Sequence, residues 1–347
     1  MNRTPRVYVL LLNWCGWRDT IECLESVFRQ AYADYRVVVC DNDSPDGSVD
    51  HIRAWAEGRE IAAVPEGHPL RHLSDPPAAK PIPLAEYDRE QAERGGDPGL
   101  DPPLVLIHTG GNLGFAGGNN VGLRYALARG DADYVWLLNN DTVVAPDALA
   151  TMVARVEAGE RVGMAGAKLL YYDEPRRVQA IAGGLLTPWQ GLATHLGSDE
   201  QDDQSRWTDP VEVDVVLGAC LLVRRTLIEE VGLLDEEYFM YSEEMDWCWR
   251  ARRRGWKLIY APGSVVWHKV GRSAGQGSPF QDYHAALGTL LFVRKNFPRL
   301  APIAMAYGLY RMLLPKIVRL EPARALAVMR AYRDYLGRSR GARPRAT

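Results

Sequence analysis

Cysteine is scarce and scattered in this chain of 347 residues. A disulfide framework uses an even number of thiols, and a zinc site usually needs two that are closely spaced. Here the number is odd and no C-x-x-C pair occurs; the five are Cys15, Cys23, Cys40, Cys220 and Cys248. The sequence therefore argues against both kinds of site and favours the reduced thiols of a cytoplasmic protein.

Long hydrophobic runs are absent as well. No stretch of eighteen apolar residues occurs, whereas a membrane-spanning helix needs about twenty. The apolar run near the N-terminus, VYVLLL at 7–12, has the length of a strand and is too short for the core of a signal peptide. We therefore predict no membrane-spanning helix.

The net charge of −3 hides an uneven distribution. From Arg294 to Arg345, thirteen Lys and Arg stand against Glu321 and Asp334, so this tail carries a net charge of +11. A basic tail on an acidic body suggests an anionic partner, either a membrane surface or nucleic acid. Because the tail contains no recognisable nucleic-acid-binding module, we expect no nucleic-acid partner.

Strand and helix patterns alternate in the first half of the chain. The apolar run 7–13 predicts a buried strand, 19–31 an amphipathic helix and 36–44 a second buried strand. This order predicts an α/β fold with a doubly wound, mostly parallel sheet. Residues 59–103 are rich in Pro, Gly and charge, and we interpret them as an inserted, partly ordered loop.

The pattern becomes helical from about residue 282 onward. We therefore expect a catalytic domain at 1–280 and a basic, amphipathic helical region at 281–347. The segment 300–320 mixes apolar residues with Arg and Lys. Two interpretations stay open for it: a helix packed on the domain, or an anchor at the inner face of the cell membrane.

Three polar clusters fall where predicted strands end, at 40–44, 108–120 and 139–142. Ligands of open parallel sheets bind at this edge. Each cluster alone could be an ordinary turn. The glycine-rich cluster at 108–120 lacks the Lys of a phosphate-binding loop. It suits either tight helix packing or a close approach of the backbone to a nucleotide sugar.

Acidic residues gather in the segment YFMYSEEMDWCWRARRRGW at 238–256. Carboxylates held close together raise one another's pKa, as a general base near neutral pH requires. Glu243, Glu244 and Asp246 are the candidates, although acids at the start of a helix also have a purely structural explanation. His268 ends a predicted strand and becomes a candidate metal ligand if a metal-binding carboxylate lies beside it.

Five segments together resemble family 2 glycosyltransferases of the GT-A fold, in particular their rhamnosyltransferase-like bacterial members. The segments are LLNWCGWRDTIECLESVFRQ, VVVCDNDSPDGS, GGNLGFAGGNNVGLRYAL, YVWLLNNDTVVAPDAL and VLGACLLVRRTLIEEVGLLDEEYFMYSEEMDWCWRARRRGWKLIYAPGSVVWH. They span most of residues 7–270 in the expected order.

The resemblance implies a role for each matching position. Asp141 would be the surviving acid of a metal motif that departs from the family at Asn139, with His268 completing the site. Glu244 would be the general base, with Glu243 and Asp246 beside it. The implied nucleotide-sugar residues are Asn13, Asp41, Asp43, Ser44, Asn112, Gly114, Gly117, Asn119 and Asn140. The implied acceptor-side residues are Gly218, Ala219 and Cys220.

By the same resemblance, we expect an inverting glycosyltransferase that uses Mg²⁺ or Mn²⁺. Its donor would be dTDP-rhamnose or a UDP-sugar, and its acceptor a surface glycan or a polyprenyl-linked sugar of polysaccharide assembly. Two alternatives stay open. A nucleotidyltransferase would want a basic residue after the first strand, where Arg18 is the candidate. The chain could also be a non-catalytic homologue that only binds a sugar nucleotide, because Asn139 and Glu244 stand where the family usually has Asp.

Overall fold

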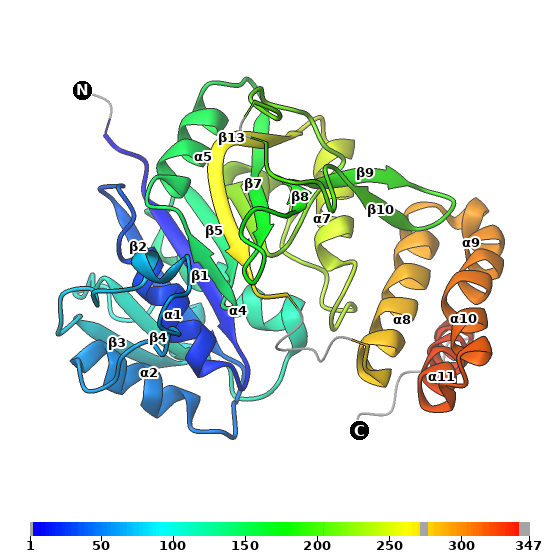
Figure 1. Cartoon of the computed structure of the whole chain (residues 1–347), viewed down its shortest axis with the longest axis horizontal. Helices are drawn as coiled ribbons and strands as arrows, with labels where there is room; N and C mark the ends of the chain where they lie inside the picture. Colours follow the sequence, from blue (N-terminus) through cyan, green and yellow to red (C-terminus); the bar gives the residue numbers. More distant parts are fainter. Residues whose placement is uncertain (1–2, 204, 271–276, 340–347) are drawn as a thin grey trace.

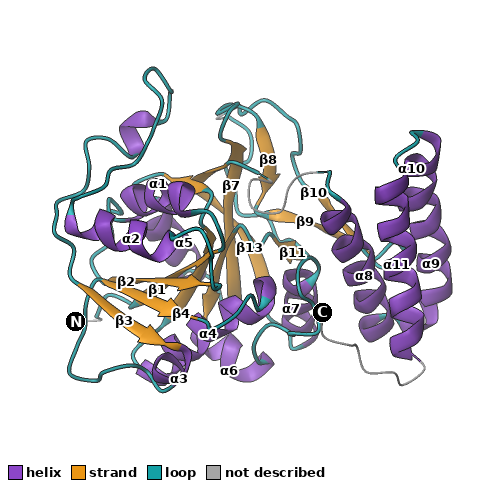
Figure 2. Cartoon of the chain, turned by 90° about the horizontal axis from the view of Figure 1, so that it is seen from below, coloured by secondary structure: helices purple, strands orange, loops and turns teal. Residues whose placement is uncertain are grey.

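A mixed sheet of thirteen strands forms the centre of this computed structural model, which describes residues 3–203, 205–270 and 277–339. The order along the sheet is β10-β9-β8-β7-β12-β5-β1-β2-β4-β3, with β11 beside β9 and β13 beside β7 and β6. Helices cover both faces of the sheet (Figure 1 and Figure 2). The prediction of an α/β fold is therefore confirmed.

The N-terminal half of the sheet is entirely parallel. Its central strands are continuous runs of buried Val, Leu and Ile, as expected for strands that are covered on both faces. The strands are β1 (Val7–Asn13), β2 (Tyr35–Asp41), β3 (Leu84–Asp88), β4 (Leu104–His108) and β5 (Tyr134–Asn139).

Alternate residues of these strands feed two separate hydrophobic cores. Val9 and Leu11 face one core, and Leu10 faces the other. One layer holds α1 (Trp17–Val27), α2 (Ser48–Glu57) and α5 (Ala148–Glu157). The opposite layer holds α3 (Arg89–Glu93), α4 (Gly114–Arg129), α6 (Arg225–Val231) and α7 (Glu243–Arg253) (Figure 2).

Antiparallel strands extend the sheet beyond β5. The strand β12 runs antiparallel to both β5 and β7. The long strand β13 runs parallel to β7, and its last three residues pair with β6, which sets His268 opposite Thr142. The strands are β6 (Thr142–Val144), β7 (Val162–Tyr171), β8 (Val178–Ile181), β9 (Gly183–Thr187), β10 (Leu192–His195), β11 (Val215–Val216), β12 (Cys220–Arg224) and β13 (Lys257–His268).

The interpretation of 59–103 as a loop was wrong for its second part. Residues 84–93 form the edge strand β3, which pairs with β4 in parallel, and the helix α3. The earlier part contains only the short 3-10 helix η1 (Arg71–Leu73). The alternating apolar residues of this strand are few, and the surrounding Pro and Gly obscured them.

Helices form the C-terminal region (Figure 1). The helix α8 packs against α7 on one side and along α11 on another. Within the described residues, no helix is both long enough and apolar enough to cross a membrane. The elements are α8 (Pro279–Asn296), η2 (Pro298–Leu300), α9 (Ala301–Gly308), the π-helical turn η3 (Leu309–Leu313), α10 (Leu314–Val318) and α11 (Pro322–Ser339). The boundary near residue 280 stays a prediction.

Candidate functional site

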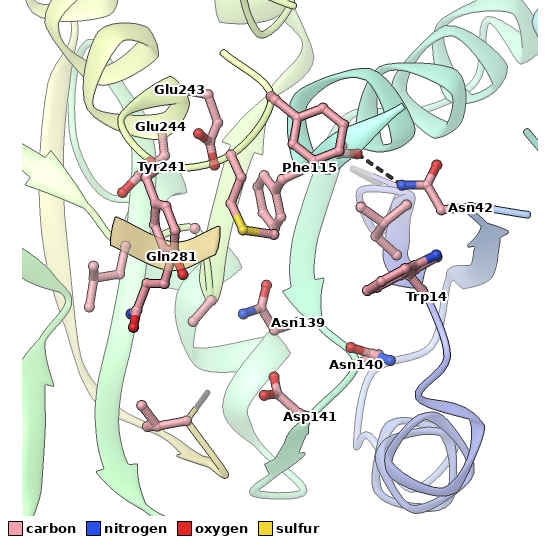
Figure 3. A pocket seen from close by; sticks show the side chains of 18 of the residues that line it. Trp14, Asn42, Phe115, Asn139, Asn140, Asp141, Tyr241, Glu243, Glu244 and Gln281 are labelled. Carbon is pink, nitrogen blue, oxygen red and sulfur yellow. Dashed lines mark hydrogen bonds between the residues drawn. The ribbon is translucent and has the colours of Figure 1, made fainter. Parts of the chain in front are cut away.

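A cavity of about 310 Å³ opens at the carboxyl ends of the parallel strands. It is lined by residues from the ends of β1, β2 and β5, from the starts of α4, α7 and α8, and from β8 and β13. Figure 3 shows Asn139 and Asp141 on one side of this space and Glu243 and Glu244 on another. The predicted residues that line it are Asn112, Gly114, Asn139, Asn140, Asp141, Gly218, Ala219, Glu243, Glu244 and His268.

Asp141 and His268 come together although they are far apart in the sequence. The pairing of β13 with β6 brings the Nε2 atom of His268 to 3.1 Å from Oδ1 of Asp141. The side-chain amide nitrogen of Asn139 lies 3.5 Å from the same Nε2 atom. Burial alone would raise the pKa of Asp141, but the attraction and hydrogen bond of His268 hold it below its usual value.

This pair fits a divalent cation. Ligand atoms about 2.0–2.1 Å from an octahedral ion lie about 3 Å apart when they are adjacent, which matches the observed separation. Among the described residues, no group of three or more His, Cys, Asp and Glu could hold a metal. Phosphate oxygens and water would therefore have to complete the shell, as Mg²⁺ sites with few carboxylates commonly do.

Gln179 of β8 orients the histidine. Its Oε1 atom lies 3.0 Å from Nδ1 of His268. An amide oxygen can only accept a hydrogen bond, so Nδ1 carries the proton and donates it. A metal held between Asp141 and His268 would take the place of the hydrogen bond from Nε2 to Asp141 and use the Nε2 lone pair while Gln179 keeps the proton on Nδ1, the arrangement that outer partners commonly impose on ligating histidines.

A largely buried ion cluster lies behind Asp141 and His268. The Nζ atom of Lys269 lies 2.6 Å from both Asp19 and Glu22 of α1, and the Tyr172 hydroxyl donates to Glu22 at 2.6 Å. The backbone N–H of Lys269 donates to the carbonyl oxygen of Asp141. The cluster thus ties α1 to the end of β13 and fixes the backbone on which Asp141 stands.

Amides and hydroxyls join the ends of β1 and β5. The side-chain nitrogen of Asn140 donates to the Thr20 hydroxyl at 2.8 Å and lies 3.3 Å from Oδ1 of Asn13. Thr20 in turn donates to Asn13 at 2.9 Å. The two asparagines are buried, so this network holds the loop between Asn139 and Asp141 in place.

Asp41 lies beside the cavity and does not line it. Asn13 donates to its Oδ1 atom at 2.6 Å, and the backbone N–H of Ser44 donates to Oδ2 at 2.9 Å. Both carboxylate oxygens are therefore engaged within the protein. The next residue, Asn42, lines the cavity instead, and Asp43 is exposed.

The glycine-rich turn serves mainly to bring α4 close to its neighbours. A Cβ atom on Gly114, whose φ is +70°, would overlap the carbonyl oxygen of Phe239. Gly117 packs against Leu113, and Asn119 donates to the carbonyl oxygen of Phe115 at 2.9 Å. Gly117 and Asn119 do not line the cavity, so tight packing, the simpler of the two explanations, accounts for them.

Glu243 and Glu244 stand at the first turn of α7 and face the cavity. Burial, reinforced by repulsion from Glu244, raises the pKa of Glu243 well above its usual value. Burial also raises the pKa of Glu244, against the opposing effect of backbone N–H groups at the helix start. Within the described structure, one buried carboxylate oxygen of each has no hydrogen-bond partner, so each remains available to a ligand.

Asp246 and Cys220 lie outside the cavity. Asp246 is buried and accepts hydrogen bonds from Arg250 at 2.7 Å and Asn296 at 2.8 Å. The Cys220 thiol is buried and accepts from the indole N–H of Trp136 at 3.3 Å. Their contacts are those of structural residues, and the placement supports neither a catalytic nor an acceptor-side role.

Several lining residues were not singled out from the sequence. Gln179 belongs to a short strand with no motif, and Trp14 follows the first strand as an exposed aromatic residue. The start of α8 adds Phe280 and Gln281 to the wall. The aromatic residues before Glu243 were a visible signal for the apolar wall, which includes Phe239; nothing in the local pattern pointed to Gln179.

Two family models and several known proteins are similar to this chain. The family model described as "Glycosyltransferase like family 2" matches residues 101–280, and "Glycosyl transferase family 2" matches residues 15–69. The hexosyltransferase Agl10 of low-salt glycan biosynthesis in Haloferax volcanii is 29% identical over 151 residues, covering 43% of this chain and 47% of Agl10.

A second curated relative comes from Mycobacterium tuberculosis. The N-acetylglucosaminyl-diphospho-decaprenol L-rhamnosyltransferase is 26% identical over 197 residues, covering 50% of this chain and 62% of that protein. The matches thus span about half to three fifths of these relatives' lengths. The mannosyltransferase PcManGT from Pyrobaculum calidifontis, solved with GDP-Man and Mn²⁺, shares the fold with a TM-score of 0.52 at 18% identity, covering 96% of this chain and 84% of PcManGT.

Proposed function

The chain belongs to glycosyltransferase family 2, and from that premise we propose that it transfers a sugar from a nucleotide-diphosphate sugar to an acceptor hydroxyl with inversion. The observation that carries the proposal is one cavity lined by Asp141, His268 and Glu244. A metal-binding pair and a candidate base thereby face the same space, as a displacement at a sugar carbon requires.

Asp141 and His268 would hold a divalent cation, with Asn139 orienting a water or contributing its amide. The cation, when bound, neutralises charge on the departing diphosphate. Mg²⁺ prefers oxygen ligands, so the imidazole nitrogen favours Mn²⁺ over Mg²⁺ here. PcManGT, which shares the fold, was solved with Mn²⁺.

Glu244 would accept the proton of the attacking hydroxyl on a carboxylate oxygen. The two neighbouring glutamates differ in environment, because repulsion by Glu244 adds to burial at Glu243, whereas backbone N–H groups oppose the effect of burial at Glu244. Because the two carboxyls repel each other, one can stay protonated while the other serves as the base. We assign the base to Glu244, the position that the family resemblance gives it.

The nucleotide would bind near the end of β1. Asp41 is held by Asn13 and Ser44, so it acts by shaping this region, while the exposed Trp14 offers a face for the base. Gly218 and Ala219 would form the acceptor side, close to Glu244. We propose dTDP-rhamnose or a UDP-sugar as donor and a surface glycan or lipid-linked sugar as acceptor, in line with the substrate that the mycobacterial relative's name gives.

Nucleotide products separate this proposal from its alternatives. The purified chain is incubated with a panel of nucleotide sugars and Mn²⁺, with and without EDTA, and the products are separated by chromatography. We expect a nucleoside diphosphate that EDTA abolishes and that Glu244→Gln suppresses. Release of inorganic diphosphate from a nucleoside triphosphate would indicate a nucleotidyltransferase instead. Tight donor binding without any turnover would indicate a non-catalytic homologue.

A further inference from the structure

The outer face of α9, η3 and α10 exposes a row of large apolar side chains. Single exposed apolar residues are ordinary on protein surfaces, but a contiguous row marks an interaction site. The row consists of Ile303, Tyr310, Leu314, Ile317, Val318 and Leu320. The first four recur at intervals of seven, four and three residues, which places them along one side of the helical segment; Val318 ends α10 and Leu320 follows it.

Positive charge accompanies this row. Residues 297–320 contain no Asp or Glu. Arg311 and Arg319 are exposed, and within the described part of the chain neither has an ion-pair partner. Lys316, by contrast, points inward and pairs with Asp282 of α8 at 3.0 Å. The outward face is therefore both apolar and cationic, a combination that fits the surface of an anionic bilayer.

A second copy of the chain fits this face poorly. A two-fold dimer would place the same patch on both sides of the interface. Arg311 and Arg319 would then meet the identical cations of the partner copy, and residues 297–320 supply no acid to neutralise them. A lipid surface provides both the apolar phase for Ile317 and Val318, which are 53% and 73% exposed, and the anions for the arginines.

We propose that the face formed by α9, η3 and α10 docks on an anionic membrane surface, with the helices lying in its plane. The face is fixed relative to the cavity, because Lys316 and Arg324 both bind Asp282 near the start of α8, at 3.0 Å and 2.6 Å. The neighbouring residues Phe280 and Gln281 line the cavity. If the proposed function is right, docking holds the cavity near a lipid-linked acceptor; the docking itself does not depend on it.

Vesicle sedimentation of the full chain tests the proposal. The vesicles contain either phosphatidylcholine alone or phosphatidylcholine with phosphatidylglycerol. One variant combines Arg311→Gln with Arg319→Gln, and a second combines Ile317→Gln with Val318→Gln. The matched control is Ile61→Gln, since Ile61 is 67% exposed on a distant loop. All these side chains are exposed, so the fold should persist, and a circular dichroism melt checks this.

We expect the wild type and the control to sediment with the vesicles that contain phosphatidylglycerol. With vesicles of phosphatidylcholine alone, both should stay in the supernatant. Each basic residue contributes about fivefold to binding an anionic surface, so the double arginine variant should bind about 25-fold more weakly. The apolar variant should also bind more weakly. Wild-type protein that stays in the supernatant, or variants that bind like the wild type, would refute the proposal.

Light scattering after size-exclusion chromatography measures the oligomeric state and tests whether this face is instead a contact between two copies of the chain. A dimer that dissociates in the Ile317→Gln and Val318→Gln variant would make this face a contact between copies. Hydrolysis of a soluble donor should be unchanged in both variants, because neither alters a cavity residue. The failure of docking and the failure of the proposed catalysis are thus read from separate measurements.

Discussion

Gln179 offers a sharp test of the proposed metal site, because it would act on a metal through His268, to which it is hydrogen-bonded. Replacement by Leu removes the acceptor that lies 3.0 Å from Nδ1 of His268. Nothing then holds the proton on Nδ1, so the ring can keep its proton on Nε2, in the hydrogen bond to Asp141, in competition with a metal. A proton there blocks the lone pair, and loss of such an outer partner typically weakens metal binding by about 10–100-fold.

The structure allows three variants to be compared. Gln179→Leu should raise the Mn²⁺ dissociation constant by about 10–100-fold, measured by calorimetry with a nucleoside diphosphate present. Gln179→Glu keeps an acceptor at the same place and should stay within a few-fold of the wild type. Gln201→Leu is the matched control, since Gln201 is exposed and does not line the cavity.

Saturating Mn²⁺ should restore most of the turnover to Gln179→Leu, because Glu244 and its surroundings are unchanged. An unaltered Mn²⁺ dissociation constant in Gln179→Leu would show that His268 does not bind the metal through Nε2. A loss of turnover that no concentration of Mn²⁺ recovers would place Gln179 in contact with the substrate instead.

The geometry of the cavity and of its supports gives four further predictions. Glu244→Gln should lower kcat by about 10² to 10⁴ while donor affinity, measured by calorimetry, stays the same. Because burial raises the pKa of Glu244, the base is protonated at low pH, and the wild-type rate should climb with pH until this raised pKa is passed. A pH profile that is already flat just above pH 5 would contradict this. Gly114→Ala should unfold at a lower temperature because its Cβ would overlap a facing carbonyl oxygen, whereas Gly111→Ala, with open space around it, should melt like the wild type. Lys269→Met would remove the cation that Asp19 and Glu22 share and should lower the free energy of unfolding in urea by about 3–5 kcal/mol; a change below about 1 kcal/mol would show that the cluster is well hydrated.

Helical spacing alone did not decide the place of Asp246. Successive residues of a helix are rotated by about 100°, so Asp246 lies about 200° around α7 from Glu244 but only about 60° from Glu243, which faces the cavity. The hydrogen bonds from Arg250 and Asn296 hold Asp246 away from the cavity, and both partners became visible only in the structure.

What the sequence alone determined was local. The buried strands, the polar residues that end them, and the acids at the start of α7 all follow from short patterns whose physical cause lies within a few residues. Parallel strands then bring Asn112, Asn140 and Asp141 to one edge of the sheet, whatever the details of packing.

Only the tertiary structure decided which groups meet across long sequence distances. The pairing of β13 with β6 brings His268 to Asp141, and β8 brings Gln179 to His268. Lys269 binds two acids of α1 that lie about 250 residues earlier. The register of distant strands depends on how the complete cores pack, and a one-residue shift would turn each side chain to the other face. No short stretch of sequence carries that information.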